Sequence, residues 1–278
     1  MSCPICQAET VGYLERRAFG EMWRLDRCRE CGHAFVVNRP TPERLEQIYS
    51  QGEHRSNQVV TVEALEAKRG CRDLATCIVD LTPLREGALD VGSGEGGFSY
   101  HLAQQGFSPI TMIDLDPGSN AATDVVTGST FERVSFENFT GQGPFAAIVM
   151  SQVLEHALDP MLWLRKAAGL LRERGALAIA VPNFGGVYRL LGYRDPMLMP
   201  PIHLNHFTAR SLRLAIEAAG MDVLRMDSTS QVRVSASERA LSQPRVLAGR
   251  MWNKLAGMLD HSTRGISLRA FATKKSAG

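Results

Sequence analysis

Short apolar runs alternate with helix-like segments along the chain from about residue 87 onward. Runs of this length, bounded by turn residues, predict buried strands, and the apolar spacing at 98–103 predicts a helix between two of them. Strands that alternate with helices indicate a parallel sheet with helices on both faces, so we expect an α/β fold. The predicted strands are 88–91, 110–113, 145–150, 176–181, 223–226 and 266–272, with a weaker one at 133–136.

The first 40 residues follow a different pattern, with strand-like stretches at 10–14 and 22–25 between two pairs of cysteines. Two residues separate the cysteines of each pair, so each pair can place both thiolates on one cation from a tight turn. Two such turns complete a tetrahedron, and a segment this small folds only with metal. We therefore predict a structural zinc ribbon whose ligands are Cys3, Cys6, Cys28 and Cys31.

Two alternatives to this zinc site stay open. A redox Cys-x-x-Cys motif needs a single pair at the start of a helix, which neither pair shows. His33, close to the second pair, could replace one cysteine ligand. The remaining cysteines, Cys71 and Cys77, lie in a helix-like stretch and are interpreted as packing residues.

These patterns divide the chain into three parts. We expect the zinc ribbon at 1–40, a helical linker or cap at 41–84, and the α/β domain at 85–278. The linker carries helices at 42–50 and 59–80, and the domain has an insertion at 228–262 that is helical at 246–259. That insertion could shape a substrate pocket, form a dimer contact or simply pack on the core.

Composition narrows the class of protein. With 44% hydrophobic and 22% charged residues, the 278-residue chain suits one large core and a small appendage. A net charge of +2 without a basic patch argues against a nucleic-acid partner. Neither a signal-peptide pattern nor an apolar run long enough to span a membrane is present, so we expect a cytoplasmic protein.

A glycine-rich turn follows the first strand of the domain. Gly92, Gly94 and Gly96 allow a tight strand-to-helix turn against which a nucleotide can lie. Gly92, Gly94 and Gly97 also match the dinucleotide fingerprint, so the glycines suit NAD as well as S-adenosylmethionine. Asp90 distinguishes the two cofactors, because a carboxylate there matches the charged amino-acid end of S-adenosylmethionine. Asp114, after the second strand, is placed to bind ribose hydroxyls.

Four segments in the correct order resemble class I methyltransferases. They are LDVGSGEG at 89–96, IDLDP at 113–117, VLEHALDP at 153–160, and LRERG at 171–175 leading to VPN at 181–183. The resemblance implies a Rossmann-like, doubly wound sheet of seven strands that binds S-adenosylmethionine. It also implies cofactor roles for Asp90 and the glycines at the methionine part, Asp114 at the ribose, Glu137 or Asn138 at the adenine amine, and Leu115, Ser151 and Gln152 nearby.

The acceptor is expected beyond the carboxyl ends of the strands, beside the segment 203–208. His203 or His206 could serve as the base that removes the acceptor's proton. Alternatively, His206 braces the loop, or Asn205 makes the contact. The chain also resembles deoxysugar C-methyltransferases and, at 154–156, ubiquinone-type O-methyltransferases. The latter present a second glutamate for a divalent ion where this chain has Gln152.

These features favour methyl transfer to oxygen or carbon of a small-molecule acceptor, sugar-derived, lipid-linked or a natural product. The cofactors would be S-adenosylmethionine and structural zinc, and the protein could be a homodimer. One alternative is a catalytically silent module that keeps the fold and docks through its ribbon. The other is an NAD-dependent oxidoreductase, supported only by the shared glycine pattern.

Overall fold

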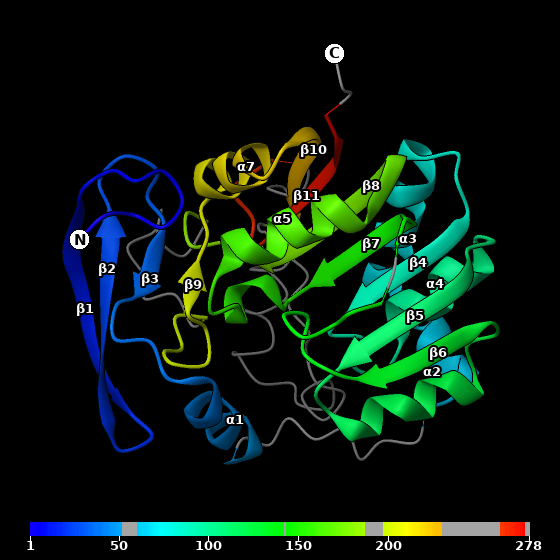
Figure 1. Ribbon diagram of the computed structural model, residues 1–278, viewed down its shortest axis with the longest axis horizontal. Coiled ribbons are helices and arrows are strands. Elements are labelled where there is room, and N and C mark those ends of the chain that lie inside the picture. Colours follow the sequence, from blue (N-terminus) through cyan, green and yellow to red (C-terminus); the bar gives the residue numbers. More distant parts are fainter. Residues whose placement is uncertain (52–59, 142, 187–196, 230–261, 276–278) are drawn as a thin grey trace, which may run out of the picture.

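The computed structural model describes residues 1–51, 60–141, 143–186, 197–229 and 262–275. It contains two sheets, a large one of seven strands and a small one of four that lies beside it (Figure 1). The strand order in the large sheet is β10-β11-β8-β7-β4-β5-β6. Its strands are β4 (Glu86–Val91), β5 (Ser108–Asp114), β6 (Ser129–Arg133), β7 (Phe145–Ser151), β8 (Leu171–Pro182), β10 (Met221–Thr229) and β11 (Ser267–Lys274).

Strand direction in the large sheet defines where a ligand can bind. The pairs β6–β5, β5–β4, β4–β7 and β7–β8 are parallel, whereas β11 runs antiparallel between β8 and β10. The expected seven-stranded, doubly wound fold is therefore confirmed, with one strand reversed. The chain leaves β4 toward β5 on one side and returns to β7 on the other, and such a switch point opens a crevice at the carboxyl ends of the strands.

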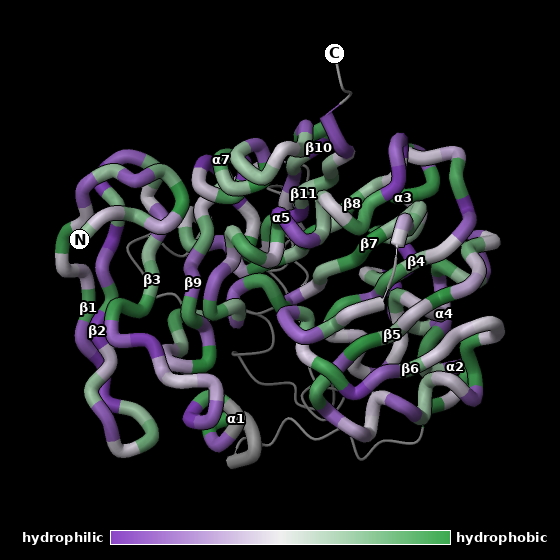
Figure 2. The backbone as a smooth tube through the Cα atoms, viewed as in Figure 1, coloured by the Kyte–Doolittle hydropathy of each residue, from purple (hydrophilic) through white to green (hydrophobic). Residues whose placement is uncertain are grey.

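Helices cover both faces of the large sheet. On one face, strand residues such as Leu89 and Ile148 pack with Leu164 of α5 (Pro160–Leu170) and Leu212 of α7 (Ala209–Ala218). The other face packs against α3 (Arg69–Leu81) and α4 (Gly97–Gln104). The strands between these two helical layers are apolar through much of their length (Figure 2). The central strands are buried on both faces, which explains why they read as continuous apolar runs.

The small sheet contains the predicted ribbon and a strand from far along the chain. Strands β1 (Thr10–Ala18), β2 (Glu21–Cys28) and β3 (Ala34–Val36) form an antiparallel meander. The fourth strand, β9 (Asn205–His206), pairs antiparallel with β3. An apolar cluster joins Trp23, Leu25 and Val36 of the ribbon to Phe184 and Leu204. The ribbon is thus packed on the α/β part of the chain, and the division at 40 and 84 stays a prediction.

The linker and the third strand differ in detail from expectation. The predicted strand 133–136 is wrong, because β6 ends at Arg133 and a turn follows. The single helix expected at 59–80 is two helices, α2 (Val62–Glu66) and α3, since Lys68 leaves the helical conformation at ψ 71°. Helix α1 (Pro42–Gln51) matches its prediction. The expected helix at 246–259 lies outside the described residues, among which no helix is long and apolar enough to cross a membrane.

Candidate cofactor and acceptor site

The glycine-rich turn begins where β4 ends. The amides of Gly92 and Ser93 donate to the carbonyl of Ile113, 2.8 and 3.1 Å away, which ties the turn to β5. Gly92 has a φ of +67°, and a Cβ placed on it would lie 2.2 Å from Cγ1 of Val153. A Cβ at Gly94 would meet no atom of the described residues within 4 Å. Gly92 is therefore required by packing, whereas Gly94 presents bare backbone to open space, as a bound ligand needs.

Asp90 lies behind this turn. It is 1% exposed, and its Oδ2 accepts hydrogen bonds from Ser99 Oγ (2.7 Å) and from the Ser99 amide (3.2 Å) in the first turn of α4. Burial raises the pKa of Asp90 to about 6, and the charge of Asp114 adds to the rise, although the hydrogen bonds from Ser99 oppose it. These contacts show that Ser99 holds Asp90 behind the turn, and the role of Asp90 at the methionine part stays a prediction.

Protonation of Asp90 should make the stability of the protein depend on pH. The pKa is raised from 3.8 to about 6, so the folded protein binds this proton more tightly than the unfolded chain. Stability should therefore fall by up to about 3 kcal/mol as the pH rises from about 4 through about 6. Urea unfolding across that range should show a flatter profile for Asp90→Asn. Substitution of exposed Asp124 by asparagine should leave the wild-type profile unchanged, and an equally steep profile in Asp90→Asn would contradict the assignment.

Asp114 ends β5 beside the glycine turn. Its Oδ2 accepts from the Gly94 amide at 2.8 Å, and its Oδ1 accepts from the Asp116 amide at 2.9 Å. Each carboxylate oxygen has a further lone pair for an incoming hydroxyl. Leu115, the next residue, is 52% exposed, which leaves an apolar side chain uncovered next to the carboxylate.

The other predicted cofactor residues lie after neighbouring strands. Ser151 is the last residue of β7, and the pairing of β7 with β4 places it near Gly92. Gln152 has a φ of +58°, and its Nε2 donates to Ser267 Oγ at 3.1 Å, so its amide is directed toward β11. Glu137 and Asn138 lie in the turn after β6, where Lys166 Nζ donates to the Glu137 carbonyl at 2.9 Å. The structure thus gathers these residues along the carboxyl edge of the sheet.

The four predicted zinc ligands form one cluster, with every pair of sulfurs within 4.8 Å. Cys3 Sγ lies 3.6 Å from Cys31 Sγ, and Cys6 Sγ lies 3.4 Å from Cys28 Sγ. Tetrahedral zinc with a bond of ~2.3 Å to each sulfur separates the sulfurs by about 3.8 Å, so the donor set fits zinc. His33 is outside this cluster, since its buried ring packs against Phe35 and Phe207.

The segment that carries the two candidate base residues connects the ribbon to the large sheet. His206 lies in β9 opposite Ala34, and burial holds its pKa well below the usual value. Asn205 Nδ2 donates to the Ala157 carbonyl at 2.7 Å. His203 is 4% exposed and precedes β9 in the chain. Its ring centroid lies 4.9 Å from that of His156. His203 therefore faces the residues that follow β7, whereas His206 is part of the ribbon sheet.

Sequence reasoning missed the environment of Glu155, which lies in η2 (Leu154–His156) just after β7. Its side chain is 1% exposed, and neither carboxylate oxygen has a hydrogen-bond partner in the described part of the chain. Burial raises the pKa of Glu155 to about 8. The sequence signal was limited to a Glu-His pair after a strand, which does not reveal burial.

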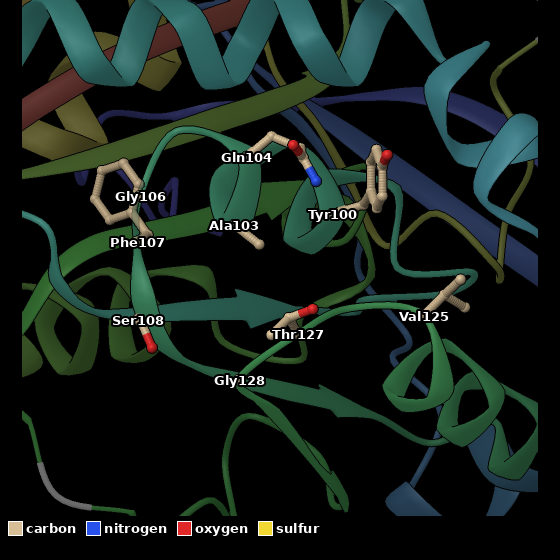
Figure 3. Close-up of a pocket in the computed structure, with 9 residues that line it drawn as sticks. All are labelled: Tyr100, Ala103, Gln104, Gly106, Phe107, Ser108, Val125, Thr127 and Gly128. Carbon is tan, nitrogen blue, oxygen red and sulfur yellow. The ribbon is translucent and has the colours of Figure 1, made fainter.

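A separate hollow opens at the amino ends of strands β5 and β6. Figure 3 shows it between α4 and the residues that precede β5 and β6. Tyr100, Gln104, Ser108 and Thr127 supply its polar groups. It lies at the amino ends of these strands, away from the glycine turn, so the site of interest is the carboxyl edge.

Comparison with known proteins agrees with this geometry. The sequence profile described as a methyltransferase domain matches residues 64–225, and the chain belongs to that family. The ubiquinone biosynthesis O-methyltransferase of Caulobacter vibrioides is 33% identical over 105 residues, which cover 34% of this chain and 40% of that protein. A Xanthomonas oryzae pv. oryzae protein with the same description is 30% identical over 122 residues, 40% of this chain and 48% of that one. The chain thus spans less than half the length of these curated relatives.

Solved structures share the fold at lower identity. Burkholderia thailandensis 1,6-didemethyltoxoflavin-N1-methyltransferase, with bound 1,6-didemethyltoxoflavin and S-adenosylhomocysteine, is 17% identical with a TM-score of 0.56. The match covers 89% of this chain and 98% of that one. A putative methyltransferase in complex with the Haloferax volcanii Trm112 activator is 16% identical with a TM-score of 0.55, over 78% and 96% of the two chains.

Proposed function

We propose that the protein transfers the methyl group of S-adenosylmethionine to oxygen or carbon of a small-molecule acceptor. The observation that carries this proposal is the exposed backbone at Gly94 beside Asp114, at the switch point of a methyltransferase-family sheet. The acceptor class that we propose is a sugar-derived, lipid-linked or natural-product molecule. A cytoplasmic location and a homodimeric assembly are further expectations from the sequence.

The residues at the carboxyl edge fit the parts of the cofactor. Asp114 would accept hydrogen bonds from the ribose hydroxyls, and Leu115 would cover the adenine together with Glu137 or Asn138. The backbone at Gly94 would lie against the methionine part. When bound, S-adenosylmethionine supplies an electrophilic methyl group on a sulfonium. The protein must then hold the acceptor in line with the methyl group and remove its proton.

His203 is the base that we favour over His206. A hydroxyl or acidic carbon gives its proton to a neutral imidazole as its electron pair forms the bond to the methyl group, and the carbon–sulfur bond breaks toward sulfur. His203 lies beside the post-β7 residues, at the edge where the acceptor is expected. His206 is committed to the pairing of β9 with β3, so we assign it a bracing role.

We also propose zinc as the structural ion of the ribbon. The cysteines would hold it as thiolates, and two amides already point at sulfur. Ile5 donates to Cys3 Sγ and Cys31 donates to Cys28 Sγ, each at 3.4 Å. Four sulfurs fill the tetrahedral shell, so this ion would organise the ribbon and take no part in methyl transfer.

Calorimetric titration of Asp114→Ala with S-adenosylhomocysteine and with S-adenosylmethionine tests the cofactor assignment. Loss of charged hydrogen bonds to the ribose, worth about 1.5–3 kcal/mol each, should weaken both ligands at least about tenfold. The matched control is Asp116→Ala, because Asp116 accepts the Gly118 amide two residues farther on and should change binding little. Binding of NAD alone to the wild-type protein would overturn the proposal and make the glycine turn a dinucleotide site.

A further inference from the structure

Three potential metal ligands come together where the segment after β7 meets the loop before β9. A carboxylate oxygen of Glu155 and one ring nitrogen each of His156 and His203 all lie within 4.8 Å of one another. The first two residues belong to η2, and His203 comes from a loop 47 positions farther along the chain. The Leu204 amide, which donates to the Glu155 carbonyl at 2.9 Å, fixes the two segments against each other.

Glu155 needs a partner that the described residues do not supply. The side chain is 1% exposed and both of its oxygens are without a hydrogen bond in the described ranges. Native proteins rarely leave a buried carboxyl group in this condition, because losing its hydration is costly unless a cation or donor compensates. A cation held between the three side chains is the compensation that this geometry allows.

Backbone carbonyls fix both histidine rings. Nδ1 of His156 lies 2.8 Å from the Ile202 carbonyl, and Nδ1 of His203 lies 2.7 Å from the Met197 carbonyl. Since a carbonyl only accepts hydrogen bonds, Nδ1 carries the proton in each ring. In the neutral ring Nε2 then holds the lone pair, and backbone carbonyls commonly fix the rings of metal-binding histidines in this way.

We propose that Glu155, His156 and His203 form a second metal site, for a divalent transition ion such as Mn²⁺, Fe²⁺, Co²⁺ or Zn²⁺. Two imidazoles and one carboxylate on one side of an ion leave positions open for further ligands, unlike the closed four-thiolate ribbon. The site shares Glu155 and His156 with the one that the ubiquinone-type resemblance suggests, but the second glutamate of that family is replaced by Gln152. The Gln152 amide is bonded to Ser267, and the third ligand comes instead from the loop before β9.

The acceptor class follows from the open positions, and this step rests on the proposed function. An ion at the carboxyl edge of the sheet would bind an acceptor oxygen and lower the pKa of its hydroxyl. The acceptor would then be an alcohol, phenol or enol methylated on oxygen, or on a carbon next to a metal-bound enolate oxygen. His203 would in that case hold the ion instead of acting as the base, and the acceptor's proton would leave to solvent. Metal binding itself does not depend on this assignment.

Titration with Mn²⁺ and with Co²⁺ of protein that carries one zinc per chain, followed by calorimetry and metal analysis, tests the site. We expect one Mn²⁺ or Co²⁺ per chain in addition to one zinc, and a Co²⁺ spectrum without thiolate charge-transfer bands. Glu155→Gln and His203→Gln should each weaken this binding at least about tenfold, because each removes one of three protein ligands. Gln152→Ala is the matched control and should bind the ion as the wild type does, since its side chain points to Ser267.

Misfolding of a variant can be separated from loss of the site. Without added metal, Glu155→Gln should unfold at the same or a higher temperature than the wild type, because it removes an uncompensated buried carboxyl group. Absence of saturable binding of either ion, or binding unchanged in both variants, would overturn the proposal. S-adenosylhomocysteine is titrated into the same samples. Cofactor binding without metal binding refutes only the second site, and metal binding without cofactor binding refutes only the proposed function.

Discussion

Replacement of Cys28 by serine is expected to release the zinc that we propose for the ribbon and to lower the free energy of unfolding by several kcal/mol. Structural zinc contributes about 10–16 kcal/mol in small zinc-finger peptides, and a ribbon with three thiolates keeps only part of that. Cys28 is 1% exposed and lies in the core cluster shared with the large sheet. The loss should therefore extend beyond the ribbon.

The predicted consequence for the α/β part follows from three contacts. Thr208 Oγ1, which also caps α7, donates to the Cys31 carbonyl at 2.8 Å. The Val36 amide donates to the Leu204 carbonyl at 2.9 Å, and β3 pairs with β9. When the ribbon loses its metal, the segment 203–208 loses its hydrogen-bonded neighbour. We expect faster amide exchange across 203–208, whereas the glycine turn, which these contacts do not reach, should stay protected.

Zinc content, thermal unfolding and hydrogen exchange of Cys28→Ser provide the measurement. Cys71→Ser is the matched control, because Cys71 is outside the four-cysteine cluster and should leave one zinc per chain. S-adenosylhomocysteine affinity should change less than about threefold at a temperature where both variants are folded. Full zinc retention in Cys28→Ser would show that Cys28 does not hold the zinc. Unchanged exchange at 203–208 would show that the ribbon does not support this loop.

Local patterns were sufficient for most of the large sheet and for the cysteine cluster. Buried strands such as β4 and β7 have apolar side chains on both faces, so their sequences are recognisable without knowledge of their neighbours. Strand β6 was misplaced because it lies at the sheet edge, where its burial pattern is mixed and one face offers little apolar signal. The spacing within each cysteine pair was enough to predict a shared site, and the four sulfurs lie within 4.8 Å of one another.

Contacts between segments far apart in the chain could not be predicted from local sequence patterns. Strand β9 has only Asn205 and His206, too few residues for an alternating pattern, and its partner β3 is about 170 positions away. The hydrogen bond from Ser99 to Asp90 is also not visible in the sequence. Likewise, Glu155 and His203 look like unrelated residues until η2 and the loop before β9 are packed together. The candidate acceptor side of the site is therefore the part that required the structure.

Replacement of Gly92 by alanine is expected to destabilise the protein and to weaken S-adenosylhomocysteine binding more than tenfold. The new Cβ would lie 2.2 Å from Val153 Cγ1, and the backbone has a φ of +67°. The left-handed conformation costs an L-residue about 1–2 kcal/mol, and relieving the overlap costs about 1–3 kcal/mol more. Either the turn or the segment after β7 must move, and both border the proposed cofactor site.

Two further variants divide this loss between its causes. Gly106→Ala measures the conformational cost alone, because Gly106 has a similar φ of +85° and its Cβ would meet no atom within 4 Å in the part of the chain that the structure describes. In Gly92→Ala/Val153→Ala the overlapping methyl group is gone. The free energy of unfolding in urea should therefore recover by the part of the loss that the overlap caused. If the double variant is no more stable than Gly92→Ala, the overlap with Val153 is not what destabilises Gly92→Ala. If it is more stable and also regains cofactor affinity, that overlap is what displaces the turn in Gly92→Ala, and packing against Val153 is what requires glycine at position 92.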